Sequence, residues 1–169
     1  MPPIRRVPID GRPVFLTIVI ADRMPLMRDD AMKVLVLDAM RSAHGRHRFR
    51  HWASVILDDH LHLLIQPAPA SKVDVIVAAI KRWVTCDRRR VAKGKGRIWQ
   101  RRFHDHVIRD DLDLRRHMDY IHYNPVKHGY CRSAADYRWS SFHAWRQRGV
   151  YPEQWGCIEP VNTVGMHPE

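Results

Sequence analysis

Two histidines separated by one residue, His60 and His62, are the most informative chemical feature of the chain. They follow one β-type run, residues 52–57, and lead into another, residues 63–65. Side chains alternate across a strand, so both imidazoles are expected on one side while Leu61 points into the core. Two imidazoles on a rigid strand make half of a divalent-metal site. The alternative is that His60 and His62 are polar residues on a solvent-exposed strand face, which would have the same spacing.

A second segment strengthens the metal interpretation. Tyr120 and Asn124 are four residues apart on a predicted helix and therefore share one face. A cation, a phenol and an amide ligand together suggest phosphodiester chemistry on a nucleic acid. The phenol, whose ordinary pKa is about 10, needs a metal ion or a base nearby to attack phosphate. Two plainer roles stay open: Tyr120 as a core aromatic, and Asn124, which precedes Pro125, as the C-terminal cap of the helix.

A competing pair, His104 and His106, has the same strand-type spacing. Asp105 lies between these two histidines and anchors a strand less well than leucine, although its carboxylate could orient an imidazole. Taken alone, either pair is more typical of a surface than of a metal site. The other histidines carry no spacing argument and are assigned structural roles: His44, His47, His51, His117, His122, His128, His143 and His167.

The positive charge of the chain is concentrated in one segment. Residues 81–102 hold ten Lys or Arg and one acid, Asp87, which gives nine of the net eleven positive charges. Aromatic side chains interleave these charges, a combination suited to tracking a single-stranded backbone and stacking on its bases. A solvated helix face is the plainer alternative. Trp83, beside Val84, is expected in the core, and Trp99 is left open between core and surface. The predicted DNA-contact residues are Lys81, Arg82, Arg88, Arg89, Arg90, Lys93, Lys95, Arg97, Trp99, Arg101 and Arg102.

Length and composition limit the class of protein. The chain has 169 residues, 45% of them hydrophobic, which suits one globular domain and a modest tail. A net charge of +11 favours a polyanionic partner. The apolar stretches are far shorter than the roughly 20 residues of a membrane span, so nucleic acid is favoured over a membrane. Three scattered cysteines predict neither a disulfide framework nor a thiolate zinc site. The N-terminus is a poor signal peptide, and we expect a soluble cytoplasmic protein.

The order of the predicted elements indicates the fold class. Gly45 is expected to end the first helix, and Pro125 is expected to limit the third. The order strand, helix, strand, strand, helix, strand favours an α+β fold, with helices on one face of an antiparallel sheet. The predicted strands cover residues 14–20, 48–57, 60–65 and 106–109, and the predicted helices cover residues 29–43, 73–91 and 111–124.

With these motifs in order, the sequence resembles the single-tyrosine HUH transposases. The stretch His60-Leu61-His62 matches their His-hydrophobe-His motif. Residues 99–106, residues 119–129 and a tail motif at residues 139–143 with 149–152 resemble one branch, the REP-associated tyrosine transposases. The resemblance spans roughly residues 14–156. The ordered set of four motifs is specific, whereas any one of them alone would not be.

The resemblance implies a ferredoxin-like, RRM-like sheet with helices packed on it. Residues 1–132 would form the catalytic domain, and residues 133–169 would form a C-terminal tail that packs on or near the active site. By position, Tyr120 would be the nucleophile that forms a 5′-phosphotyrosine, and His60, His62 and Asn124 would hold Mg²⁺ or Mn²⁺. The implied partner is single-stranded DNA at REP hairpins, bound by a monomer rather than a dimer, in the bacterial cytoplasm at the nucleoid.

Two other function classes fit the same residues. A non-catalytic hairpin-binding module would bind the DNA without forming a covalent adduct. A zinc or manganese phosphoesterase would use water as its nucleophile and would not need Tyr120.

Overall fold

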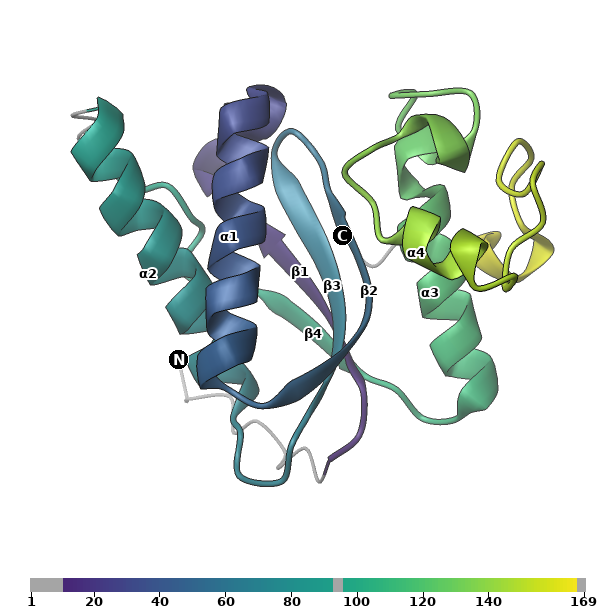
Figure 1. Ribbon diagram of the computed structural model, residues 1–169, viewed down its shortest axis with the longest axis horizontal. Coiled ribbons are helices and arrows are strands. Elements are labelled where there is room, and N and C mark those ends of the chain that lie inside the picture. Colours follow the sequence, from purple (N-terminus) through teal and green to yellow (C-terminus); the bar gives the residue numbers. More distant parts are fainter. Residues whose placement is uncertain (1–10, 93–95, 167–169) are drawn as a thin grey trace.

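The structure, a computed structural model, describes residues 11–92 and 96–166 and is built around a four-stranded antiparallel sheet (Figure 1). The strand order β2-β3-β1-β4, with helices connecting β1 to β2 and β3 to β4, is the predicted ferredoxin-like arrangement. The strands are β1 (Val14–Val19), β2 (Phe49–Ile56), β3 (His60–Pro67) and β4 (His104–Val107). The helices are α1 (Asp30–Arg46), α2 (Val73–Ala92), α3 (Asp111–Lys127) and α4 (Phe142–Gln147), and short 3-10 helices cover Ala21–Arg23, Leu26–Arg28, Ala134–Asp136 and Val161–Thr163.

Alternation along the strands gives the sheet two different faces. Helices α1 and α2 lie on one side of the sheet (Figure 1). Leu16 of β1 pairs with Leu63 of β3, and both are fully buried in the core. The next pair in register, Thr17 and His62, points to the opposite face, where α3 packs against the ring of His62 through Tyr120. The prediction of helices on one face is therefore confirmed for α1 and α2, and α3 adds a layer on the other face.

Local sequence explains where α1 begins and why it ends late. The Asp29 carboxylate accepts a hydrogen bond from the backbone N–H of Ala31 and caps the helix, as an acid at the start predicts. Gly45 does not end the helix, so that prediction was wrong. The chain leaves α1 through His47, whose backbone is extended (φ −120°, ψ 113°), and enters β2 directly. No left-handed glycine is needed for such an exit.

The second helix has one buried and one exposed side. Ile76, Ile80 and Val84 are buried against the core, at the helical spacing that the sequence predicts. Asp74 and Arg82, on the opposite side of α2, are both exposed. None of the helices in the described ranges combines the length and the apolar character that crossing a membrane requires.

The tail that follows α3 covers the free edge of β2. The backbone N–H of Ile56 donates to the carbonyl of Trp139 at 3.0 Å, and the N–H of Ser141 donates to the carbonyl of Ser54 at 2.9 Å. An edge strand exposes unpaired backbone groups that other chains can bind. By pairing with these groups, the tail becomes part of the folded domain.

Candidate active site

His60 and His62 alternate with Leu61 on β3 and so point to the same face of the sheet, where His62 contacts Tyr120 of α3. Their Nε2 atoms are 3.2 Å apart, and the two residues are 2% and 0% exposed. Two nitrogens that bind one cation at roughly 2.1 Å stand roughly 3.0–3.4 Å apart in octahedral or tetrahedral geometry. The observed separation therefore fits two ligands of one ion.

Neighbouring groups fix the orientation of both imidazole rings. His60 Nδ1–H donates to Asp59 Oδ1 at 2.6 Å, and His62 Nδ1 is hydrogen-bonded to Thr17 Oγ1 at 3.0 Å. Burial raises the pKa of Asp59, but the bonds from His60 and Arg23 outweigh this effect and lower it, so the carboxylate stays ionised. Outer bonds of this kind at Nδ1 are typical of histidines that bind a metal through Nε2.

Helix α3 brings Tyr120 against this pair. The ring centroids of Tyr120 and His62 are 5.5 Å apart, in an edge-to-face arrangement. Two turns farther along the same helix face, the ring of His128 lies 5.8 Å from the ring of His60. Asn124 lies between Tyr120 and His128, the C-cap residue, so the C-terminal part of α3 runs beside the histidine pair. The predicted shared face of Tyr120 and Asn124 is therefore present.

The helix continues past Asn124 although Pro125 follows. Pro125 lies inside α3, and the backbone N–H of His128 donates to the carbonyl of Asn124 at 3.0 Å. Proline at this position removes an N–H donor from the helix but does not stop it. The side chain of Asn124 is no helix cap, because neither its oxygen nor its nitrogen has a hydrogen-bond partner within the described structure.

The unpartnered amide of Asn124 is the best evidence for a ligand. The residue is fully buried, and burying an unsatisfied polar group costs roughly 1–3 kcal/mol. A cation coordinated by the amide oxygen would remove part of this penalty. Paired imidazole nitrogens and one amide oxygen therefore fit a divalent cation.

Lys127 places a positive charge over the phenol ring. Its Nζ lies 4.8 Å from the ring centroid of Tyr120 and donates to the carbonyl of Met166, near the end of the tail, at 2.9 Å. Tyr120 is only 1% exposed. The phenol ring is therefore enclosed by the surrounding chain.

A chain of hydrogen bonds around His122 fastens the tail to α3 and β2. Burial lowers the pKa of His122 to about 3, so its ring is neutral. Tyr151 Oη donates to Asp119 Oδ1 at 2.7 Å, which leaves its oxygen to accept from His122 Nδ1–H at 3.0 Å. His122 Nε2 then accepts from Ser141 Oγ at 2.9 Å, and Ser141 Oγ in turn accepts from the N–H of Ser54 at 2.8 Å. Every bond in this chain has one defined donor.

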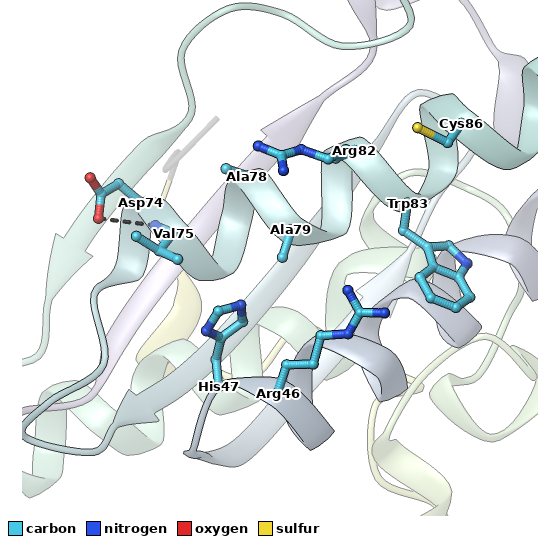
Figure 2. Close-up of a pocket in the computed structure, with 9 residues that line it drawn as sticks. All are labelled: Arg46, His47, Asp74, Val75, Ala78, Ala79, Arg82, Trp83 and Cys86. Carbon is cyan, nitrogen blue, oxygen red and sulfur yellow. Dashed lines mark hydrogen bonds between the residues drawn. The ribbon is translucent and has the colours of Figure 1, made fainter.

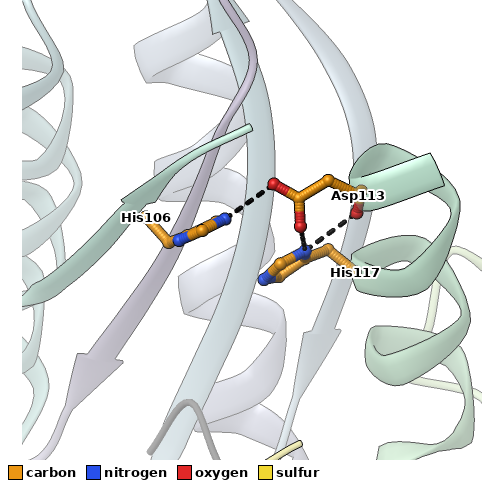
Figure 3. Close-up of side chains that lie close together, drawn as sticks. All are labelled: His106, Asp113 and His117. Carbon is orange, nitrogen blue, oxygen red and sulfur yellow. Dashed lines mark hydrogen bonds and ion pairs between the residues drawn. The ribbon is translucent and has the colours of Figure 1, made fainter. Parts of the chain in front are cut away.

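His106, Asp113 and His117 form a second cluster, between β4 and α3 (Figure 3). His106 Nε2–H donates to Asp113 Oδ2 at 2.9 Å, and His117 Nδ1 donates to the backbone carbonyl of Asp113 at 2.9 Å. Burial raises the pKa of Asp113, but bonds from His106 and the N–H of Arg109 outweigh it and hold the pKa at about 2. Ligand atoms of the three side chains lie within 4.8 Å of one another, so this His/Asp group could hold a metal ion. His104 and His106 therefore do not act as a pair of metal ligands, because His104 is exposed and only His106 belongs to this cluster.

The basic segment is less uniform than the sequence implies. Trp99 is 4% exposed and belongs to the core, which argues against its predicted role in stacking. Lys81 Nζ donates to the carbonyl of Gln100 at 2.9 Å and so holds the connector before β4. The exposed members are Arg82, Arg97, Arg101 and Arg102. Lys93, Lys95 and the side chains of Arg88, Arg89 and Arg90 lie outside the described residues.

Comparisons with known proteins identify the family. No family model matches the chain. A Haemophilus influenzae protein assigned as a REP-associated tyrosine transposase is 38% identical over 165 residues, which cover 89% of this chain and 91% of the relative. The chain belongs to the REP-associated tyrosine transposases. A member of this family from Escherichia coli K12 is 34% identical over 152 residues, which cover 89% of this chain and 88% of that relative.

Solved structures agree with this family. A REP-associated tyrosine transposase bound to a REP hairpin superposes with a TM-score of 0.81 at 30% identity, over 96% of each chain. A Deinococcus radiodurans protein described as a transposase has a TM-score of 0.50 at 15% identity and shares the fold alone. The predicted family and fold class are thus confirmed, and the chain is a transposase with a four-stranded antiparallel sheet.

Sequence reasoning overlooked several residues at this site. His122 was assigned a generic structural role, yet it is the centre of the bonds that hold the tail. Lys127, seven residues after Tyr120, could have been found from helical spacing, since positions seven apart share a face. His117 had no such signal, because its partner His106 comes from a different element.

Proposed function

We propose that this transposase cleaves and rejoins single-stranded DNA at REP-type hairpins, with Tyr120 as the nucleophile and Mg²⁺ or Mn²⁺ held by His60, His62 and Asn124. The observation that carries the proposal is the buried Asn124 amide without a partner, on the helix face that packs Tyr120 against the facing Nε2 atoms. The hairpin substrate is supported by the similar transposase whose structure contains a REP hairpin.

The reaction exchanges one phosphodiester for another. Tyr120 Oη loses its proton to solvent and attacks the scissile phosphorus, forming a 5′-phosphotyrosine. The bond from phosphorus to the 3′ oxygen breaks, and that oxygen takes up a proton to give a free 3′-hydroxyl. Attack by a 3′-hydroxyl on the phosphotyrosine reverses the step and joins strands without ATP. A cation bound here would supply Lewis-acid polarisation of the phosphate oxygen.

Side chains of the chain itself support the charges in this step. The ammonium of Lys127, over the ring of Tyr120, favours the negative charge that the phenol oxygen carries when it attacks. Asp59 and Thr17 keep the Nε2 atoms of the two histidines turned toward a common point. Two imidazole ligands suit Mn²⁺ better than Mg²⁺, which prefers an all-oxygen shell.

One observation favours a second function, a module that binds hairpins without cleaving them. Tyr120 is almost completely buried, and a buried phenol has little access to a DNA strand. Such a module would keep the basic surface and the fold and would use neither the phenol nor a cation.

A covalent-adduct assay tests the proposal. The protein is incubated with hairpin DNA that carries an unpaired flank, in Mn²⁺, and separated on a denaturing gel. We expect a protein–DNA band for the wild type and for Tyr123→Phe, and none for Tyr120→Phe, with equal shifts of all three on native gels. A native shift without any covalent band would support the binding module. Loss of the band in Tyr123→Phe alone would refute the assignment of Tyr120.

A further inference from the structure

A groove of about 540 Å³ lies between the end of α1 and the exposed side of α2. Figure 2 shows the small side chains of Ala78 and Ala79 on α2, with Trp83 one turn farther along that helix. Arg46 and His47 line the opposite side, from the end of α1. None of the described residues that line the groove belongs to the candidate active site, so the two sites are separate.

Trp83 lies in this groove and not in the core, so the prediction for this residue was wrong. It is 37% exposed, whereas Val84, the next residue, is fully buried. Successive residues on a helix point about 100° apart, and the apolar stripe of α2 passes through Val84. The guanidinium carbon of Arg46 lies 5.7 Å from the centroid of the tryptophan ring. An exposed indole beside an arginine is a surface on which an unpaired base can stack.

The surroundings of the groove are positively charged. An adjacent hollow shares Arg46 and His47 with it and adds Arg48 and Lys72. Among the described residues, Asp74 supplies the one carboxylate that lines either hollow, and it accepts a hydrogen bond from the backbone N–H of Val75 at 3.0 Å. The described cations that line the two hollows are Arg46, Arg48, Lys72 and Arg82.

We propose that this groove binds unpaired DNA adjoining the segment that is cleaved, with one base stacked on Trp83 and the backbone along the cations. The inference rests on the proposed function and adds the place where a flanking strand is held. A single strand is favoured over a duplex because only an unpaired base can lie flat on an indole. It is favoured over an acidic peptide because charge alone would leave the exposed tryptophan without a role.

The test measures equilibrium binding without chemistry. In the Tyr120→Phe background and without metal, fluorescence anisotropy gives the Kd for a labelled blunt hairpin and for the same hairpin with an unpaired flank. Trp83→Ala should weaken binding of the flanked hairpin about tenfold, the usual effect of removing one stacking platform, and leave the blunt hairpin unchanged. For the flanked hairpin, Arg46→Ser should reduce the slope of the logarithm of affinity against the logarithm of salt concentration by about 0.7. This is the value for one contact to a single-strand phosphate.

Arg148→Ser is the matched control, because Arg148 lies 5.2 Å from the ring of Trp145 in a similar pair outside the groove. It should change neither Kd. Equal affinity of Trp83→Ala and the parent for the flanked hairpin would overturn the proposal. An equal loss of affinity for the blunt hairpin would also overturn it, because the groove would then hold the stem. A failed adduct assay in the wild type would instead refute the proposed function and leave these affinities unaffected.

Discussion

Mild acid should loosen the tail from α3 by protonating His122. Burial lowers the pKa of this histidine from 6.5 to about 3, and both ring nitrogens already have partners, Tyr151 and Ser141. Because the folded pKa lies below the unfolded one, the contribution to stability is fully present above pH 6.5 and is lost as the pH falls toward 3. Linkage between these two pKa values gives a loss of about 2 kcal/mol between pH 7 and pH 5.

Urea unfolding at pH 7 and pH 5, in EDTA, measures this loss. His122→Gln is the comparison, because glutamine keeps one donor and one acceptor but does not titrate. The two proteins differ only at residue 122, so the difference between their losses reports on His122. We expect the wild type to lose about 2 kcal/mol more free energy of unfolding than the variant over this interval. An equal loss in both proteins would show that protonation of His122 does not control the attachment of the tail.

Three further substitutions test the site and its support. Asn124→Leu should raise the free energy of unfolding of the metal-free protein by about 1 kcal/mol, because it removes an unsatisfied amide. It should also abolish the Mn²⁺-dependent adduct. A less stable variant that still cleaves would contradict the metal role. Lys127→Met should slow adduct formation about tenfold or more, because one positive charge at the phenol is lost. Lys127→Arg should be affected less. Equal rates of adduct formation in the wild type and Lys127→Met would exclude this role. Asp113→Asn should destabilise the fold by about 2 kcal/mol at pH 7, because the depressed pKa of Asp113 gives stability above pH 3.8 that is lost as the pH falls to about 2. Urea titrations showing the same difference at pH 7 and at pH 2.5 would refute this origin.

The fold was predictable because each strand and helix follows a local pattern. Alternation around Leu61 placed His60 and His62 on one face, and the register with β1 confirms it. The shared face of Tyr120 and Asn124 required only helical spacing and a helix that tolerates Pro125. The burial of Asn124 could not be read locally, since it depends on how α3 packs on the sheet.

The contacts that sequence reasoning missed join elements distant along the chain. His122 binds Ser141 and Tyr151 of the tail, and no spacing rule relates these positions. Trp83 was placed in the core because its neighbour Val84 is apolar, but the helix turns these two side chains in different directions. Trp99 has arginines nearby in the sequence but is buried in the core, and its backbone forms a β-bridge with Ile20.

Pulsed electron paramagnetic resonance on bound Mn²⁺ tests most directly which histidines hold the cation. We expect nitrogen couplings from two imidazoles that are lost in His60→Ala with His62→Ala and kept in His106→Ala with His117→Ala, which removes the other histidine cluster. Couplings that persist without His60 and His62 and vanish without His106 and His117 would contradict the account, because the metal would then lie between β4 and α3.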